Sequence, residues 1–107
     1  MKFAWIFLIV AGLFEIGWPL GLKISQSPGR MVFGIAVAVT CMALSGAFLW
    51  LAQKQIPMGT AYAIWTGIGA TGTFLVGVAF FGDPASLLRW LALFLIISGI
   101  VLFKVAN

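Results

Sequence analysis

The chain has 107 residues, of which 64% are hydrophobic and only 7% are charged. Soluble domains are about 45–50% apolar and about 25% charged, so this composition excludes an ordinary water-soluble domain. The net charge of +4 comes from six basic residues that are scattered singly, which excludes a nucleic-acid-binding patch. His is absent, and the single Cys41 excludes an internal disulfide and a Cys/His metal site. We therefore expect no metal, no cofactor and a lipid bilayer as the solvent.

Four apolar runs are long enough to be transmembrane helices. A bilayer core about 30 Å thick requires roughly 20 apolar residues per helix. The predicted spans are separated by short polar loops that contain Pro or Gly, and they cover residues 3–22, 31–52, 59–81 and 86–105. The apolar part of a cleavable signal peptide is only about 7–15 residues long, so we expect the first helix to remain in the protein. The sequence predicts an all-α membrane protein with one four-helix domain over residues 1–107.

The basic residues are divided evenly between the two predicted ends of the helices. Short loops make consecutive helices antiparallel, which puts both termini on one side of the membrane. The terminus side then carries Lys2, Lys54 and Lys104, and the other side carries Lys23, Arg30 and Arg89. The positive-inside rule therefore favours neither orientation. We interpret this tie as dual topology, in which two oppositely inserted copies would supply the inverted repeat that larger transporters carry within one chain. The alternative is a single orientation fixed by another bias in the chain.

Glu15 is the charged residue that lies neither at a predicted helix end nor in a loop. A carboxylate at this depth costs a few kcal/mol unless it is protonated or paired. The predicted spans offer it no Lys, Arg or His at mid-membrane depth, so its partner is a proton, a bound cation or the Glu15 of a second copy. The alternative is a protonated Glu15 that only forms a hydrogen bond between helices of an oligomer.

The neighbours of Glu15 favour a cation-binding site. Ala11 and Trp18 share its helical face, so Ala11 leaves space beside the carboxylate and the Trp18 indole lies one turn away. Charge pairing and a cation–π contact could then hold the same cation. Pro19 has no N–H, which leaves the Glu15 carbonyl without its usual helical partner. The site thus gains a spare hydrogen-bond acceptor.

Polar groups on the second and third spans could reach the same carboxylate. Tyr62 and Trp65 share a helical face, and buried Tyr and Trp side chains usually need a hydrogen-bond partner, for which a carboxylate is the best acceptor here. For Tyr62, the alternative is a position in an interfacial aromatic belt. Ser45 is a lone hydroxyl in the second span that could reach a carboxylate across a helix pair, although packing alone also explains it. These three residues are candidate pocket residues.

Small or helix-breaking residues near the site are candidates for close packing or for a hinge. The first span contributes Gly12 and Pro19, and the third contributes Gly67, Gly69 and Gly72. Gly lowers the cost of bending a helix and lets neighbouring helices approach closely.

Together these residues resemble the small multidrug resistance family of four-helix, proton-coupled exporters. The most specific element is the third-span string Gly-Thr-Ala-Tyr-Ala-Ile-Trp-Thr-Gly-Ile-Gly-Ala over residues 59–70, supported by Glu15, the turn at Pro57 and the break at residues 82–84. The resemblance covers the whole chain.

Within the family, the chain is most similar to the guanidinium-exporter subtype, because Trp18 follows Glu15 by three residues and Gly-Leu-Lys at residues 21–23 closes the helix. The subtype commonly has small or aliphatic residues where this chain has Gly17 and Pro19, so the pocket beside Glu15 can differ in shape.

The resemblance implies a multi-pass antiporter of the bacterial inner membrane that exchanges protons for guanidinium and small substituted guanidinium cations. It implies that Glu15 binds both proton and substrate, that Trp18, Ser45, Tyr62 and Trp65 line the pocket, and that the assembly is an antiparallel homodimer. The alternatives are a quaternary-ammonium exporter of the same family, a dual-topology ion channel and a non-transporting membrane subunit. The sequence offers no nucleophile–base pair, so we do not expect an enzyme.

Overall fold

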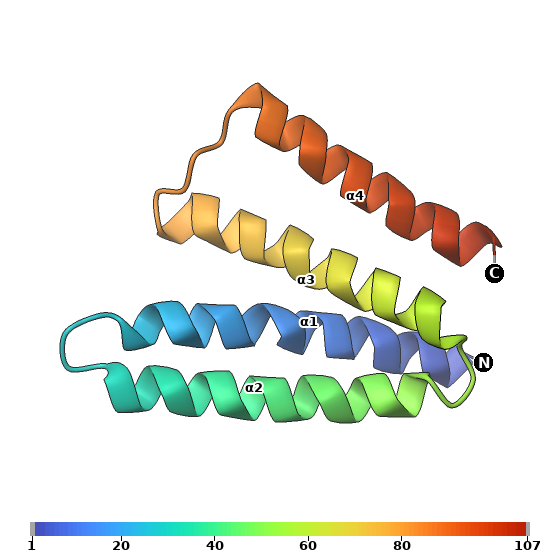
Figure 1. Cartoon of the computed structure of the whole chain (residues 1–107), viewed down its shortest axis with the longest axis horizontal. Helices are drawn as coiled ribbons and strands as arrows, with labels where there is room; N and C mark the ends of the chain where they lie inside the picture. The colour runs from blue at the N-terminus through green and yellow to red at the C-terminus, as the bar shows by residue number, and fades with distance from the viewer. Residues whose placement is uncertain (1, 107) are drawn as a thin grey trace.

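The computed structural model describes residues 2–106, with side chains from Phe3 onward. The chain forms four consecutive antiparallel helices (Figure 1), which are α1 (Lys2–Ser25), α2 (Met31–Ala52), α3 (Met58–Phe80) and α4 (Leu87–Ala106). Each helix is long and apolar enough to cross a membrane. The prediction of four transmembrane helices is confirmed, and the helix bounds lie within three residues of the expected spans.

The loops between the helices contain the residues that stop or start a helix. Gly29 and Gly82 adopt φ angles of 76° and 69°, a left-handed conformation that glycine tolerates at little cost. Pro57 precedes the first residue of α3 with a φ of −53°, close to the value that its ring imposes. These short loops place the two ends of the described chain at the same end of the molecule (Figure 1).

The helices form an open layer instead of a closed bundle. They lie side by side in the order α4, α3, α1, α2 (Figure 1), and the molecule measures 45 × 34 × 17 Å along its principal axes. Within residues 2–106, α4 contacts only α3, whereas α1 contacts both α2 and α3. Both broad faces of the layer are therefore left uncovered by the chain itself.

Helices α1 and α2 form the most extensive helix pair. Three small α2 residues spaced by seven, Ala38, Ser45 and Ala52, are buried, so one narrow face of α2 lies against α1. Near the loop between the two helices, a Cβ at Gly21 would lie only 2.7 Å from the carbonyl oxygen of Gly34. In lipid, burial of apolar surface gives little driving force for helix association. Helices associate there through close van der Waals packing, which small residues permit.

The tightest part of the core lies at the terminus end of the layer. The buried side chains that contact one another there come from α1, the end of α2, the second loop and the start of α3, namely Ala4, Leu8, Ala52, Ile56, Ala61 and Ile64. This cluster packs α3 against α1 at the terminus end of the layer, between that end and Glu15.

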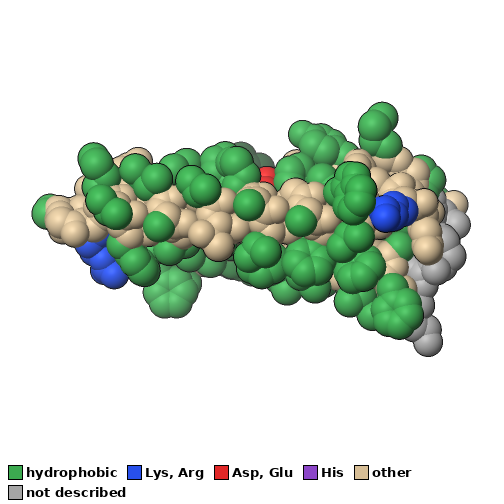
Figure 2. All heavy atoms as spheres, turned by 90° about the horizontal axis from the view of Figure 1, so that it is seen from below, with side chains coloured by type: hydrophobic (Ala, Val, Ile, Leu, Met, Phe, Trp, Pro, Cys, Tyr) green, Lys and Arg blue, Asp and Glu red, His purple; other side chains and the backbone are tan. Residues whose placement is uncertain are grey.

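Basic side chains lie at the two ends of the layer, next to aromatic rings. Four cations stack over rings at 4.4–5.5 Å from the centroid, in the pairs Arg30 with Phe33, Lys54 with Trp50, Arg89 with Phe74, and Lys104 with Trp5. Cations and aromatic rings together are typical of membrane interfaces. In Figure 2 the basic side chains occupy the ends and an acidic side chain is visible about midway along one edge of this view, among hydrophobic groups.

Candidate functional site

The carboxylate of Glu15 is hydrogen bonded to the indole of Trp18. The Trp18 Nε1–H donates to Oε1 of Glu15 over 2.8 Å. The two residues are three apart in α1, so the helix itself brings their side chains to one face. This is the one side-chain hydrogen bond to Glu15 within residues 2–106. The remaining acceptor capacity of the carboxylate stays available to a ligand.

Helix α3 passes close to the stem of the Glu15 side chain at Gly69. A Cβ added at Gly69 would overlap Cγ of Glu15, so only a glycine leaves room for the side chain in this position. Gly69, which the sequence suggested as a packing or hinge residue, therefore forms part of the wall around the carboxylate. Both Glu15 and Trp18 remain partly exposed, so the pair is accessible from one face of the layer.

Ser45 connects all three helices around the site. Its hydroxyl donates to the carbonyl oxygen of Ala11 over 2.7 Å and accepts the Nε1–H of Trp65 over 2.8 Å. Ser45 is only 1% exposed, and its hydroxyl uses both a donor and an acceptor function. The Ala11 carbonyl lies one turn before Glu15 on α1, so Trp65 is fixed relative to the turn that carries the carboxylate.

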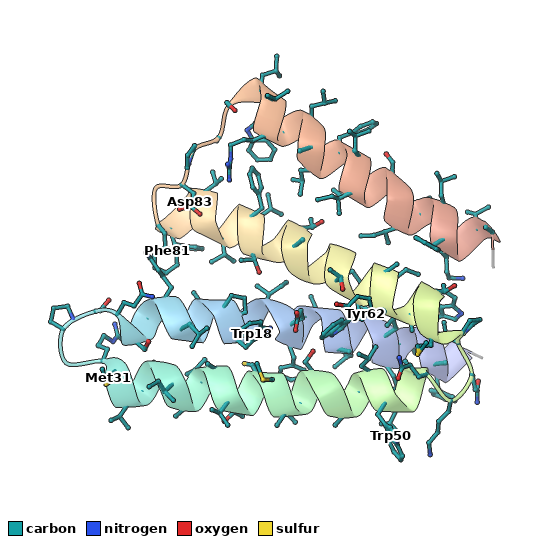
Figure 3. All side chains as sticks on the ribbon, viewed as in Figure 1. Trp18, Met31, Trp50, Tyr62, Phe81 and Asp83 are labelled. Atoms are coloured by element: carbon teal, nitrogen blue, oxygen red, sulfur yellow. The ribbon has the colours of Figure 1, made fainter. Side chains whose placement is uncertain are left out.

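Tyr62 lies beside Trp65 on α3. The two rings are tilted by 47° with centroids 5.4 Å apart. Tyr62 is 57% exposed, and Figure 3 shows it on the part of α3 that crosses α1. Its ring therefore lies next to the Trp65–Ser45 hydrogen bond, with more than half of its surface exposed on the layer.

The other candidate packing and hinge residues all lie at helix contacts or within a continuous helix. A Cβ at Gly12 would meet Ile68, one at Gly67 would meet Ile100, and one at Gly72 would meet Ile16. Helix α3 is continuous through Gly67, Gly69 and Gly72, and α1 is continuous through Pro19. Close packing accounts for these glycines in this conformation, and their role as a hinge stays a prediction.

The structure groups the predicted pocket residues into two hydrogen-bonded sets. Trp18 pairs with Glu15, and Trp65 pairs with Ser45 and stacks near Tyr62. The sequence reasoning suggested that Tyr62 or Trp65 would donate to the carboxylate, whereas in this chain Trp65 donates to Ser45.

The Ala11 carbonyl was missed as part of the site, and Gly69 was expected only as a packing or hinge residue and not as the wall against Glu15. No sequence signal marks the Ala11 carbonyl as an acceptor, and the contact between Gly69 and Glu15 depends on how α3 packs against α1.

The arrangement can bind an organic cation that donates hydrogen bonds. Glu15 supplies the negative charge, and its N–H partner at Trp18 orients one oxygen while the other remains able to accept. The Trp18 and Tyr62 rings can contribute cation–π contacts. Among the residues described, no three His, Cys, Asp or Glu side chains come together in a way that could hold a metal ion.

Comparison with known proteins gives consistent matches over nearly the whole chain. The family model described as Small Multidrug Resistance protein matches residues 3–96. A protein of Yersinia pseudotuberculosis named guanidinium exporter is 47% identical over 97% of this chain and 99% of its own length. Proteins of the same name from Salmonella typhimurium and Escherichia coli are 45% and 42% identical, covering 96% and 97% of this chain and 97% and 98% of their own lengths.

These matches and the four apolar helices show a multi-pass protein of the bacterial inner membrane. Because the family model covers most of the chain and the relatives align from end to end, the chain belongs to the small multidrug resistance family.

Proposed function

We propose that this protein is a proton-coupled antiporter that exports guanidinium and small substituted guanidinium cations. The observation that carries the proposal is the Glu15–Trp18 pair, a carboxylate held by an indole N–H near the middle of the apolar helix α1. The similarity to proteins named guanidinium exporter supports the class of substrate. On this proposal the protein is a transporter and not an enzyme.

Guanidinium matches the chemistry of the site. It is planar, stays charged at physiological pH like the Arg head group, and presents N–H groups in pairs that a carboxylate can accept. The hydrogen bonds from Trp18 to Glu15 and from Trp65 to Ser45 hold polar groups in place before the cation arrives. Acceptors held in fixed positions favour a cation that donates hydrogen bonds over a hydrophobic cation that has no N–H groups.

Proton coupling follows from competition for one carboxylate. A guanidinium ion pairs only with deprotonated Glu15, so binding of the cation displaces a proton and binding of a proton displaces the cation. A transporter that changes sides only when loaded with one or the other exchanges the two. The inward proton gradient would then drive export.

A second copy of the chain completes the site in this proposal. The helices form an open layer, so Glu15 faces a surface that the chain does not cover by itself. The even division of basic residues permits both orientations in the membrane. An antiparallel homodimer would place two Glu15 side chains in one chamber and would allow its inward-open and outward-open forms to be close in energy.

The test is the release of protons when guanidinium is added to the detergent-purified protein in weak buffer near neutral pH. We expect stoichiometric release by the wild type, and an apparent guanidinium affinity that increases with pH until Glu15 is fully deprotonated. Affinity that does not change with pH would contradict shared use of the carboxylate.

A quaternary-ammonium exporter is the second candidate, because the exposed Tyr62 ring beside Trp65 could hold a cation without N–H groups. Tetrapropylammonium is therefore the comparison ligand. Proton release by guanidinium alone supports the proposed substrate class, and release by both ligands widens it to polyspecific cation export. Release by neither ligand would overturn the transport proposal.

A further inference from the structure

A cavity of about 230 Å³ lies between α1 and α3, on the side of Glu15 that faces away from the terminus end. It is lined by α1 residues and by the end of α3 with its following loop, including Lys23, Thr73, Phe81 and Asp83. Figure 3 shows Phe81 and Asp83 at the end of α3, next to the C-terminal part of α1. We refer to this cavity as the α1–α3 groove.

The inner end of the groove lies beside the helical turn that carries Glu15, although Glu15 does not line the groove itself. Ile16 lines its inner end and is the next residue after Glu15. On α1, positions 15, 19 and 23 are spaced by four and share a face, and positions 69, 73 and 77 do the same on α3. Gly69 is in contact with the Glu15 stem, and Thr73 and Gly77 line the groove. A helix rise of about 1.5 Å per residue puts Lys23 about 12 Å from Glu15 along α1.

The chain has only two acidic residues, of which Asp83 lines the groove and Glu15 directly precedes Ile16, its innermost α1 residue. Asp83 is exposed and lines the mouth of the groove. The backbone of Asp83 is held in place, because its N–H donates to the carbonyl of Gly77 over 3.1 Å and Gly82 makes the preceding turn. The Asp83 side chain lies directly against Gly77, where a Cβ would collide with Oδ2. The carboxylate therefore lies at the wall of the groove and stays exposed at its mouth.

We propose that Asp83 is an outer cation-binding site, at which a guanidinium-type cation is captured from water before it moves along the groove to Glu15. This inference rests on the proposed transport function and deepens it. Asp83 supplies the charge, Thr73 offers a hydroxyl oxygen farther in, and the Phe81 ring forms part of the wall.

Lys23 lines the same cavity and limits how tightly the outer site holds its cation. An ion moves along a path only if each binding site attracts it and yet binds it weakly enough to release it. A lone carboxylate would hold the cation for longer, whereas a nearby ammonium group offsets part of the attraction. We therefore assign Asp83 to capture and Lys23 to release.

The test compares the rate at which guanidinium associates with purified wild-type and variant proteins, followed by stopped-flow proton release. At low ionic strength we expect Asp83→Asn to slow association about three- to tenfold, because an attractive charge at the mouth of a cleft raises the on-rate. The difference should shrink as salt screens the charge. Asp83→Glu should keep the fast rate, and Lys23→Gln should increase it.

The matched control is the double variant Asp83→Asn/Gln26→Glu. It restores the net charge at an exposed position in the first loop that does not line the groove, and it leaves the balance of basic residues unchanged. We expect the double variant to stay slow, and recovery of the wild-type rate would show an effect of net charge and would overturn the outer site. Asp83→Asn with a wild-type rate at low ionic strength, or with a defect of equal size at every ionic strength, would also overturn it.

Failure of the outer site and failure of the proposed function give different results. If wild-type protein releases no proton with guanidinium, the transport proposal fails and the outer site falls with it. If wild-type protein responds and Asp83→Asn associates equally fast at low ionic strength, only the outer site is wrong.

Discussion

The Trp18 indole donates a 2.8 Å hydrogen bond to the Glu15 carboxylate from one turn farther along the same helix. One α1 face thus carries both the acceptor of a cation and the group that orients it. Both groups belong to α1, so the helix itself brings them together, while Gly69 of α3 leaves the room that the Glu15 stem needs. The pair can therefore move as a unit if the helices shift relative to one another.

Replacing Glu15 by Gln should abolish guanidinium binding and guanidinium-driven proton release. The amide keeps the size of the side chain and can still accept from Trp18, but it carries no charge and takes up no proton at neutral pH. Isothermal titration and the weak-buffer proton assay measure the two effects, and an unchanged elution volume in detergent checks the assembly. Persistent substrate-driven proton release by this variant would refute the role of Glu15.

Substitutions of Trp18 should distinguish the contribution of its aromatic ring to guanidinium binding from the contribution of its N–H group. Trp18→Phe keeps an aromatic surface but removes the donor to Glu15, and we expect guanidinium affinity to fall about tenfold, or about 1.4 kcal/mol. Trp18→Ala should weaken binding further because the cation–π surface is lost as well. Equilibrium titration at fixed pH measures both. Unchanged affinity in Trp18→Ala would remove Trp18 from the binding site.

Ser45→Ala should weaken guanidinium binding much more than tetrapropylammonium binding. The change leaves the Trp65 N–H without its acceptor, at a cost of about 1–3 kcal/mol, and frees the Trp65 ring from α2. Trp65→Phe removes the donor instead, so the double variant should be less damaging than the sum of the two single variants. Additive losses in this double-mutant cycle would show that the hydrogen bond does not couple the two residues.

Gly69→Ala should displace the carboxylate and lower guanidinium affinity about tenfold or more. The new Cβ would overlap Cγ of Glu15, which must then adopt another rotamer. Gly46→Ala is the matched control, because a Cβ there meets nothing within 4 Å. Titration of both variants should show loss only for the first. Equal effects of the two would mean that alanine acts through helix propensity and not through Glu15.

Dual topology predicts that a label added from one side of intact cells reaches about half of the protein. Ser27→Cys in a Cys41→Ser background places one thiol in the exposed first loop, and a membrane-impermeant maleimide reports its side. Because the basic residues are balanced, Gln26→Lys should shift the labelled fraction away from one half. Complete labelling, or none, in the Ser27→Cys protein would establish a single orientation.

The four helices and the position of Glu15 near the middle of the first helix could be predicted from the sequence alone. Four apolar runs of membrane-spanning length leave few alternatives, because every backbone N–H and C=O within lipid must be paired inside its own helix. The Glu15–Trp18 pair is also local, since a spacing of three in a helix fixes which side chains meet.

The tertiary structure alone decided the partners that lie far apart in the chain. The sequence contains the Ser45 hydroxyl, the Trp65 indole and Gly69, but only the packing of α1 between α2 and α3 determines that Ser45 meets Ala11 and that Gly69 meets Glu15. The alignment of Asp83 with the α1–α3 groove likewise depends on how α3 lies along α1. Periodicity specifies the face of each helix, whereas the rotation and axial offset between helices come from close packing of side chains across the whole interface.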